Sequence, residues 1–115
     1  MSAPTAPVVI VFGVTDLDTA KTLWSALLGT EPYADSPYYV GYRVGDLEIG
    51  LDPSAASRGV TTPISYWATD DIAARTDALV AAGATVQRPA SDVGGGMLVA
   101  VLADADGNLV GLRQA

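Results

Sequence analysis

The chain has 115 residues, half of them hydrophobic, with a mean hydropathy of +0.31 and a formal net charge of −7 at pH 7. This length and apolar content suffice for one packed domain and argue against intrinsic disorder. Cysteine and histidine are both absent, which excludes disulfides and thiolate chemistry and removes the commonest general base and transition-metal ligand.

The six basic residues are scattered along the chain, whereas nucleic-acid binding requires clustered Lys and Arg. The first residues lack the basic start of a signal peptide, and the apolar run Val8–Val14 is too short to span a membrane. The sequence therefore predicts a cytoplasmic protein with neither a nucleic-acid nor a membrane partner.

The first half is expected to contain one strand, one helix and three further strands. After a loose tail over residues 1–7, the β-branched run Val8–Val14 predicts a strand covered on both faces. Apolar residues at helical spacing predict a helix over Leu17–Leu28, with Asp16 as its N-cap and Gly29 after its last turn. The further strands are expected at Glu31–Asp35, Tyr38–Val44 and Leu47–Asp52.

The second half repeats this order. After a small, polar linker over residues 53–62, Asp70 is expected to cap a helix over Asp71–Ala82, which Gly83 ends. The caps and the terminal glycines recur at one common spacing, which indicates an internal repeat. The modules are expected at about residues 7–52 and 63–114 of a single domain over 1–115. The strands of the second half are expected at Pro63–Thr69, Ala84–Pro89, Met97–Ala103 and Asn108–Arg113.

Strand alternation predicts a face of each module that no helix covers. A two-residue turn at Gly45-Asp46 would place Arg43 opposite Glu48 and Gly41 opposite Gly50, leaving a gap that suits close approach of a ligand. In the last strand pair, a four-residue turn would place Ala100 opposite Gly111. The predicted ligand-binding residues are Val11, Trp24, Tyr39, Gly41, Arg43, Glu48, Gly50, Ile64, Tyr66, Leu98, Ala100, Gly111 and Arg113. The alternative is that the two halves bury these faces against each other.

Two segments resemble a known family. VFGVTDLDTAKTLWSALLGTEP is similar to the opening of the glyoxalase / bleomycin-resistance / extradiol dioxygenase (vicinal oxygen chelate) superfamily, although Leu23-Trp24 stands where Phe-Tyr is usual. DADGNLVGLRQ resembles the closing D-P-D-G-x-x-(I/V)-E-L, with Ala105 in place of the proline. The resemblance covers nearly the whole chain. It implies an α+β fold in which two βαβββ modules form a curved eight-stranded cup, with one helix per module on the outer face.

The resemblance also says where a metal would bind. Metal-using members take a ligand from the first and the last strand of each half, which by position are Val9, Gly50, Ile64 and Gly111. None has a donor side chain, although divalent metals need oxygen, nitrogen or sulfur ligands. The resemblance therefore implies a member that holds no metal and no other cofactor.

The metal-free precedent is the bleomycin-resistance type, in which acidic homodimers sequester a cationic antibiotic. It implies a metal-independent small-molecule binding protein for an aromatic or cationic compound, with a role in antibiotic resistance. One alternative is a metal-independent isomerase, cyclase or lyase, with Glu48 as base and Tyr66 or Arg113 stabilising negative charge. Another is a non-catalytic structural or regulatory subunit. For Glu48, the competing interpretation is a plain ion pair with Arg43 across the strands.

Overall fold

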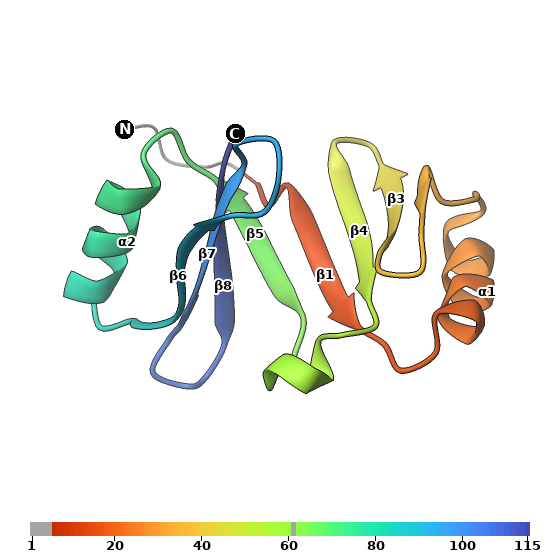
Figure 1. The fold of residues 1–115 in the computed structure, drawn as a ribbon, viewed down its shortest axis with the longest axis horizontal. Coiled ribbons are helices and arrows are strands. Elements are labelled where there is room, and N and C mark those ends of the chain that lie inside the picture. The colour runs from red at the N-terminus through yellow and green to blue at the C-terminus, as the bar shows by residue number, and fades with distance from the viewer. Residues whose placement is uncertain (1–5, 61) are drawn as a thin grey trace. The chain divides into compact units, whose positions relative to one another are not determined.

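The computed structural model describes residues 6–60 and 62–115 (Figure 1). Residues 1–5 of the predicted tail and position 61 of the predicted linker lie outside the described residues. By its internal contacts the chain divides into two compact units, one over Val9–Pro63 and the other comprising residues 6–8 and Ile64–Ala115. Each unit has its own helix and its own hydrophobic core.

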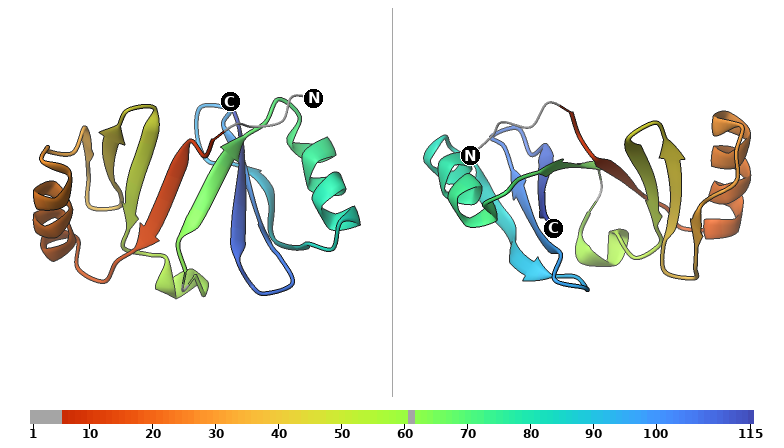
Figure 2. Two further views of the ribbon diagram at one scale, coloured as in Figure 1. Left: turned by 180° about the vertical axis from the view of Figure 1, so that it is seen from behind. Right: turned by 90° about the horizontal axis from the view of Figure 1, so that it is seen from above.

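The first unit folds as a β-α-β-β-β module. Its strands lie in the order β2-β3-β4-β1, in which β1 is parallel to β4 and the other neighbours are antiparallel. The helix α1 packs on one face of this sheet (Figure 2). The elements are β1 (Val9–Gly13), α1 (Leu17–Leu28), β2 (Ala34–Asp35), β3 (Val40–Val44) and β4 (Leu47–Asp52), followed by a short 3-10 helix, η1 (Ala56–Arg58).

The helix α1 begins and ends as the sequence predicts. The Asp16 carboxylate accepts hydrogen bonds from the backbone amides of Asp18 and Thr19 at 3.0 and 3.3 Å, and Gly29 ends the helix with a φ of 69°. These amide bonds favour the charged carboxylate and lower the pKa of Asp16. The helix packs on a buried cluster formed by Val40, Tyr42, Ile49 and Leu51.

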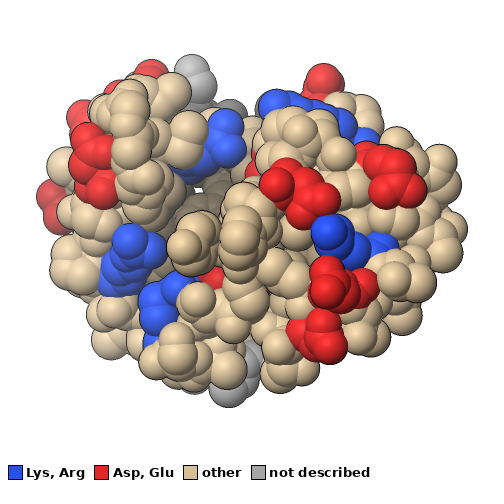
Figure 3. All heavy atoms as spheres, turned by 45° about the vertical axis from the view of Figure 1, so that its right-hand side comes forward, with Lys and Arg blue, Asp and Glu red and all other residues tan. Residues whose placement is uncertain are grey.

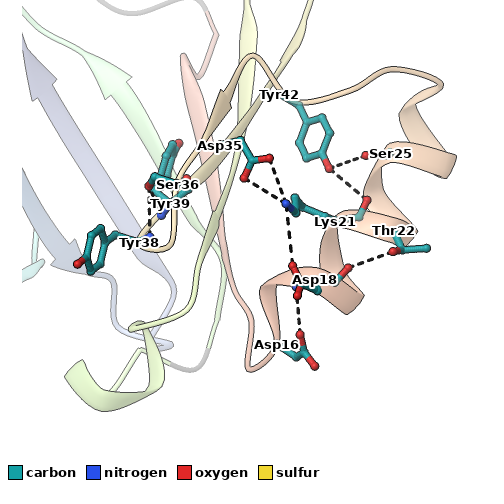
Figure 4. A network of polar contacts seen from close by, with 10 residues as sticks. All are labelled: Asp16, Asp18, Lys21, Thr22, Ser25, Asp35, Ser36, Tyr38, Tyr39 and Tyr42. Carbon is teal, nitrogen blue, oxygen red and sulfur yellow. Dashed lines mark hydrogen bonds and ion pairs between the residues drawn. The ribbon is translucent and has the colours of Figure 1, made fainter.

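A buried phenol joins α1 to the sheet. Tyr42 on β3 is fully buried, and its hydroxyl lies 2.8 Å from Ser25 Oγ and donates to the Lys21 carbonyl at 3.2 Å (Figure 4). The Lys21 ammonium continues this link, because it donates to both oxygens of Asp35 on β2 at 3.1 and 3.2 Å. The bond to Asp35 raises the pKa of Lys21. The helix is thus held to two strands by polar as well as apolar contacts.

The second unit repeats the β-α-β-β-β order, with strands arranged β5-β8-β7-β6 and β5 parallel to β8. Ile72 of the helix is buried in a core with Ala100, Leu102 and Leu112 of the sheet. The predicted α+β class with two βαβββ modules is therefore confirmed. The elements are β5 (Ile64–Ala68), α2 (Ile72–Ala81), β6 (Thr85–Asp92), β7 (Leu98–Ala103) and β8 (Leu109–Gln114).

The cap of α2 differs from the prediction by one residue. Asp71 has extended backbone angles (φ −146°, ψ 90°), and its carboxylate accepts from the Ala74 amide at 3.0 Å. The Thr69 hydroxyl in turn accepts from the Asp71 amide at 3.2 Å, which places Asp71 and not Asp70 at the start of the helix. Neither α1 nor α2 is long and apolar enough to cross a membrane within the described residues.

The register of the last strand pair is also different from the prediction. The Asp104 carboxylate accepts from the amides of Asp106 and Asn108 at 2.9 and 2.8 Å, and from the Asn108 side chain at 2.9 Å. These bonds draw Asn108 into the turn, so the strands are joined by five residues, and Ala103 pairs with Leu109. In consequence Val101 lies opposite Gly111.

The first testable prediction concerns this turn. The Asn108 side chain and amide lower the pKa of Asp104 below its ordinary 3.8, so the native state favours the charged carboxylate. Its stabilising contribution is therefore full above the ordinary pKa and is lost as the pH falls through the lowered one. We expect Asp104→Ala to reduce the thermal midpoint at neutral pH, and the difference from the unsubstituted protein to shrink on acidification. Asp106→Ala is the control, because Asp106 donates to Asp104 through its backbone amide, which the substitution retains.

A second prediction concerns the buried phenol. Tyr42→Phe removes one hydroxyl and leaves Ser25 Oγ and the Lys21 carbonyl without it, so we expect the free energy of unfolding to fall by about 1–2 kcal/mol with the fold retained. Urea denaturation measures the change. Tyr38→Phe is the matched control, because Tyr38 is 80% exposed. An equal effect of the two substitutions would contradict the role assigned to Tyr42.

Candidate functional site

The helix-free face of the first module carries the residues that the sequence places there. Gly41 pairs with Gly50 and Arg43 with Glu48, as the two-residue turn predicts. On the parallel side of β4, Val11 pairs with Gly50. Directly paired residues share one face of a sheet, and this face is opposite to the side chains that pack on α1.

Glu48 lies at the centre of the polar contacts on this face. The Tyr33 hydroxyl donates to its Oε1 and the Tyr39 hydroxyl to its Oε2, so each carboxylate oxygen accepts from a different phenol. Hydrogen bonds to an ionised acceptor are about twice as strong as neutral ones. Glu48 and Tyr39 are half-buried, and Tyr33 is 52% exposed.

Backbone contacts place the two phenols beside the carboxylate. The Tyr33 amide donates to the Gly41 carbonyl at 3.0 Å, which continues the pairing of β2 with β3 beyond its first residue. Before β3, Ser36 Oγ accepts from the amides of Tyr38 and Tyr39 at 3.2 and 3.1 Å and closes a tight turn (Figure 4). Tyr33 was missed by the sequence analysis, and a register for β2 on β3 was the signal that could have revealed it.

Arg43 makes a different contact from the one expected. Its guanidinium carbon lies 4.6 Å from the centroid of the Tyr33 ring, a cation–π arrangement. The described residues form ion pairs at Lys21–Asp18, Lys21–Asp35 and Arg58–Asp52, and the predicted pair between Arg43 and Glu48 is not among them. The two phenols satisfy the carboxylate in its place.

The glycines on this face accommodate aromatic rings. A Cβ atom on Gly50 would lie 2.7 Å from both Cε1 and Cζ of Tyr39, closer than side-chain carbons approach. A Cβ atom on Gly41 would lie 3.1 Å from Tyr33 and 3.2 Å from Tyr39. The gap that the sequence predicts for a ligand is therefore filled at Gly50 by the ring of Tyr39.

The second module shows the same relation. Tyr66 on β5 pairs with Gly111 on β8, and a Cβ atom on Gly111 would lie 2.7 Å from Tyr66 Cγ and 2.6 Å from its Cε1. Arg113 follows on the same strand, where it pairs with Ala68 and Val99 and is half-buried.

Three predicted site residues lie on the helix side of their sheets. Trp24 packs against Phe12 with ring centroids 4.8 Å apart and joins the core beneath α1. Ala100 is fully buried in the core beneath α2, and Leu98 packs against that core. The one-residue register shift at the Asp104 turn moves Leu98 and Ala100 to this side, and these three residues are therefore left out of the candidate site.

The residues at the family's metal positions do not fit a metal ion. Val9 and Ile64 are aliphatic and only 5% exposed, and Gly50 and Gly111 have no side chain. Nor do the described residues contain a group of three or more acidic side chains placed to hold a metal ion. On the face seen in Figure 3, Lys and Arg are interspersed with Asp and Glu and form no basic stripe.

Comparison with known proteins identifies the family. The model of the Glyoxalase/Bleomycin resistance protein/Dioxygenase superfamily matches residues 7–112, and the chain belongs to this superfamily. A search of curated proteins finds no match.

Solved structures with the same fold include proteins of several kinds. A superfamily member from Vibrio splendidus has a TM-score of 0.69 at 15% identity, with 93% of this chain and 97% of that chain covered. Methylmalonyl-CoA epimerase from Mycobacterium tuberculosis has a TM-score of 0.73 at 17% identity, covering 99% and 92%. The Mn(II)-bound glyoxalase from Novosphingobium aromaticivorans has a TM-score of 0.72 at 18% identity, covering 99% and 40%. These likenesses establish the fold.

The ring-over-glycine contacts predict unequal effects of two similar substitutions. The methyl group of Gly50→Ala would clash with the far end of the Tyr39 side chain, which can turn away if it gives up its hydrogen bond to Glu48. The methyl group of Gly111→Ala would clash with Tyr66 Cγ, the ring atom nearest the backbone, and the ring can move away there only if the strand shifts. We expect a loss of about 1–3 kcal/mol in the free energy of unfolding for Gly111→Ala and a smaller loss for Gly50→Ala.

Urea denaturation measures both effects. Repeating Gly111→Ala in a Tyr66→Ala background provides the control, because the ring is then absent and alanine has the higher strand propensity. An undiminished penalty in that background would show that the ring is not its cause.

Proposed function

We propose that the chain is a metal-independent small-molecule binding protein of the bleomycin-resistance type, which holds its ligand on the helix-free face around Glu48. The observation that carries this proposal is the carboxylate of Glu48 with a phenol on each oxygen, beside the stacked pair of Arg43 and Tyr33. A mostly apolar surface with a few convergent polar groups is typical of small-molecule sites.

The side chains on this face favour an aromatic or cationic ligand. Tyr33 and Tyr39 offer ring surfaces for stacking, and Glu48 supplies a negative charge next to them. The net charge of −7 favours the approach of a cation over that of an anion. Sequestration of such a compound needs no reaction step, and a role in antibiotic resistance and a homodimeric state are parts of this proposal.

Metal independence rests on the donor set. The four positions that supply ligands in metal-using members hold two aliphatic residues and two glycines, Val9, Ile64, Gly50 and Gly111. Oxygen, nitrogen or sulfur ligands are required for divalent ions, and these positions provide none. The proposed binding therefore depends on the aromatic and polar side chains of the face.

A metal-independent isomerase, cyclase or lyase is the second candidate, and one observation favours it. A carboxylate bonded to two phenols forms a short chain of groups that can hold or pass a proton. Each oxygen of Glu48 accepts one hydrogen bond and keeps a second lone pair, so a base role requires the substrate proton to reach the part of the carboxylate that the phenols leave open.

The test is a thermal-shift screen with planar aromatic cations, followed by calorimetric titration of the compounds that stabilise the protein. We expect saturable binding that weakens about tenfold in Glu48→Gln, which corresponds to the loss of roughly one charge-assisted hydrogen bond. Glu31→Gln is the matched control, because Glu31 is the only other glutamate of the chain and is exposed.

Two results would count against the proposal. One is a panel in which no aromatic cation stabilises the protein, and the other is equal affinity in the two glutamine variants. Chemical conversion of a bound compound, followed by NMR, would favour the enzyme over the sequestering protein.

A further inference from the structure

Gly50 and Gly111 occupy two of the positions at which metal-using members of the superfamily carry a ligand, and both lie against a tyrosine ring. Atoms of Tyr39 and of Tyr66 come within 2.7 Å of the point where the first carbon of a side chain would begin. A donor side chain at either position would therefore compete with a ring for the same space. The absence of donors and the presence of rings are separate features of the two sites.

The two rings reach their glycines from strands that do not correspond in the repeat. Tyr66 lies on β5 and pairs with Gly111, whereas Val11 on β1 pairs with Gly50. In the first module the ring comes from Tyr39, which precedes β3 on the other side of β4. Duplication of one ancestral module does not explain this coincidence, because the covering residue is different in each half.

We infer that the rings of Tyr39 and Tyr66 close the two glycine positions to metal ions, a steric barrier that acts in addition to the missing donor side chains. This inference rests on the metal-independent function proposed above and adds a second physical cause to it. In the first module the closure has a second component, since the Tyr39 hydroxyl also engages Oε2 of Glu48, the carboxylate two residues from Gly50. Donor side chains alone would then not create a metal site while the ring remains.

The composition of the chain makes a clean test possible. It contains no histidine and no cysteine, so introduced histidines are the only imidazole or thiolate ligands that a metal ion can find. Val9 pairs with Glu48, and Gly50 is the next residue on the same face of β4, so Val9→His with Gly50→His places two imidazoles and a carboxylate together within the first module. Untagged protein is titrated with Cu²⁺ alone, and the imidazole-to-copper absorption is followed together with calorimetry.

The two-histidine protein is compared in four backgrounds. With Tyr39 present we expect binding at least tenfold weaker than with Tyr39→Ala. Tyr39→Phe, which keeps the ring and removes the hydroxyl, separates closure by the ring from engagement of Glu48. Tyr38→Ala is the matched control, because Tyr38 is the neighbouring tyrosine and is 80% exposed, and it is expected to leave the weak binding unchanged.

Equal copper affinity with and without Tyr39 would overturn the inference and leave the proposed function intact. A stoichiometric divalent ion bound by the unsubstituted, untagged protein would instead overturn the proposed metal independence.

Circular dichroism checks that each variant folds. A measurement on the unsubstituted protein needs no variant: nuclear Overhauser contacts are expected from Gly50 Hα to the Tyr39 ring and from Gly111 Hα to the Tyr66 ring. Their absence in the folded protein would refute the closure directly.

Discussion

The helix-free faces depend on one steric constraint: a strand glycine leaves the room that a neighbouring tyrosine ring requires. Over Gly50 this allows Tyr39 to lie close to the sheet and to place its hydroxyl on Glu48. The second oxygen of Glu48 is then available to Tyr33, and Arg43 stacks on that ring without pairing with the carboxylate. The polar arrangement of the face thus follows from the absence of one side chain.

The two faces of each sheet have separate roles. On the helix side, alternating apolar side chains pack beneath α1 and α2 and form a buried core in each unit. On the other side, glycines weaken the strands, and the tyrosines beside them make specific polar contacts through their hydroxyls. Structures as different in function as a Mn(II)-bound glyoxalase and a methylmalonyl-CoA epimerase are similar to this fold, so the fold by itself does not determine the chemistry.

Local signals were enough to predict much of this architecture. The helix α1 follows from the cap at Asp16 and from Gly29, and the register of the first hairpin follows from its two-residue turn. The last hairpin was mispredicted by one residue because the bonds of Asp104 enlarge its turn, and a shift of one residue exchanges the faces of a strand. For this reason Ala100 proved to be a core residue.

The sequence by itself determined the family, the repeated module and the lack of metal-binding side chains at the expected positions, because these depend on residue identity and on short-range periodicity. Only the tertiary structure decided which side chains meet across the strands. Trp24 is part of the core and Tyr33 joins Glu48, since both outcomes depend on contacts between segments far apart in the chain. The rings over Gly50 and Gly111 were likewise decided by the tertiary structure, because a glycine in the sequence indicates free space but does not say which side chain fills it.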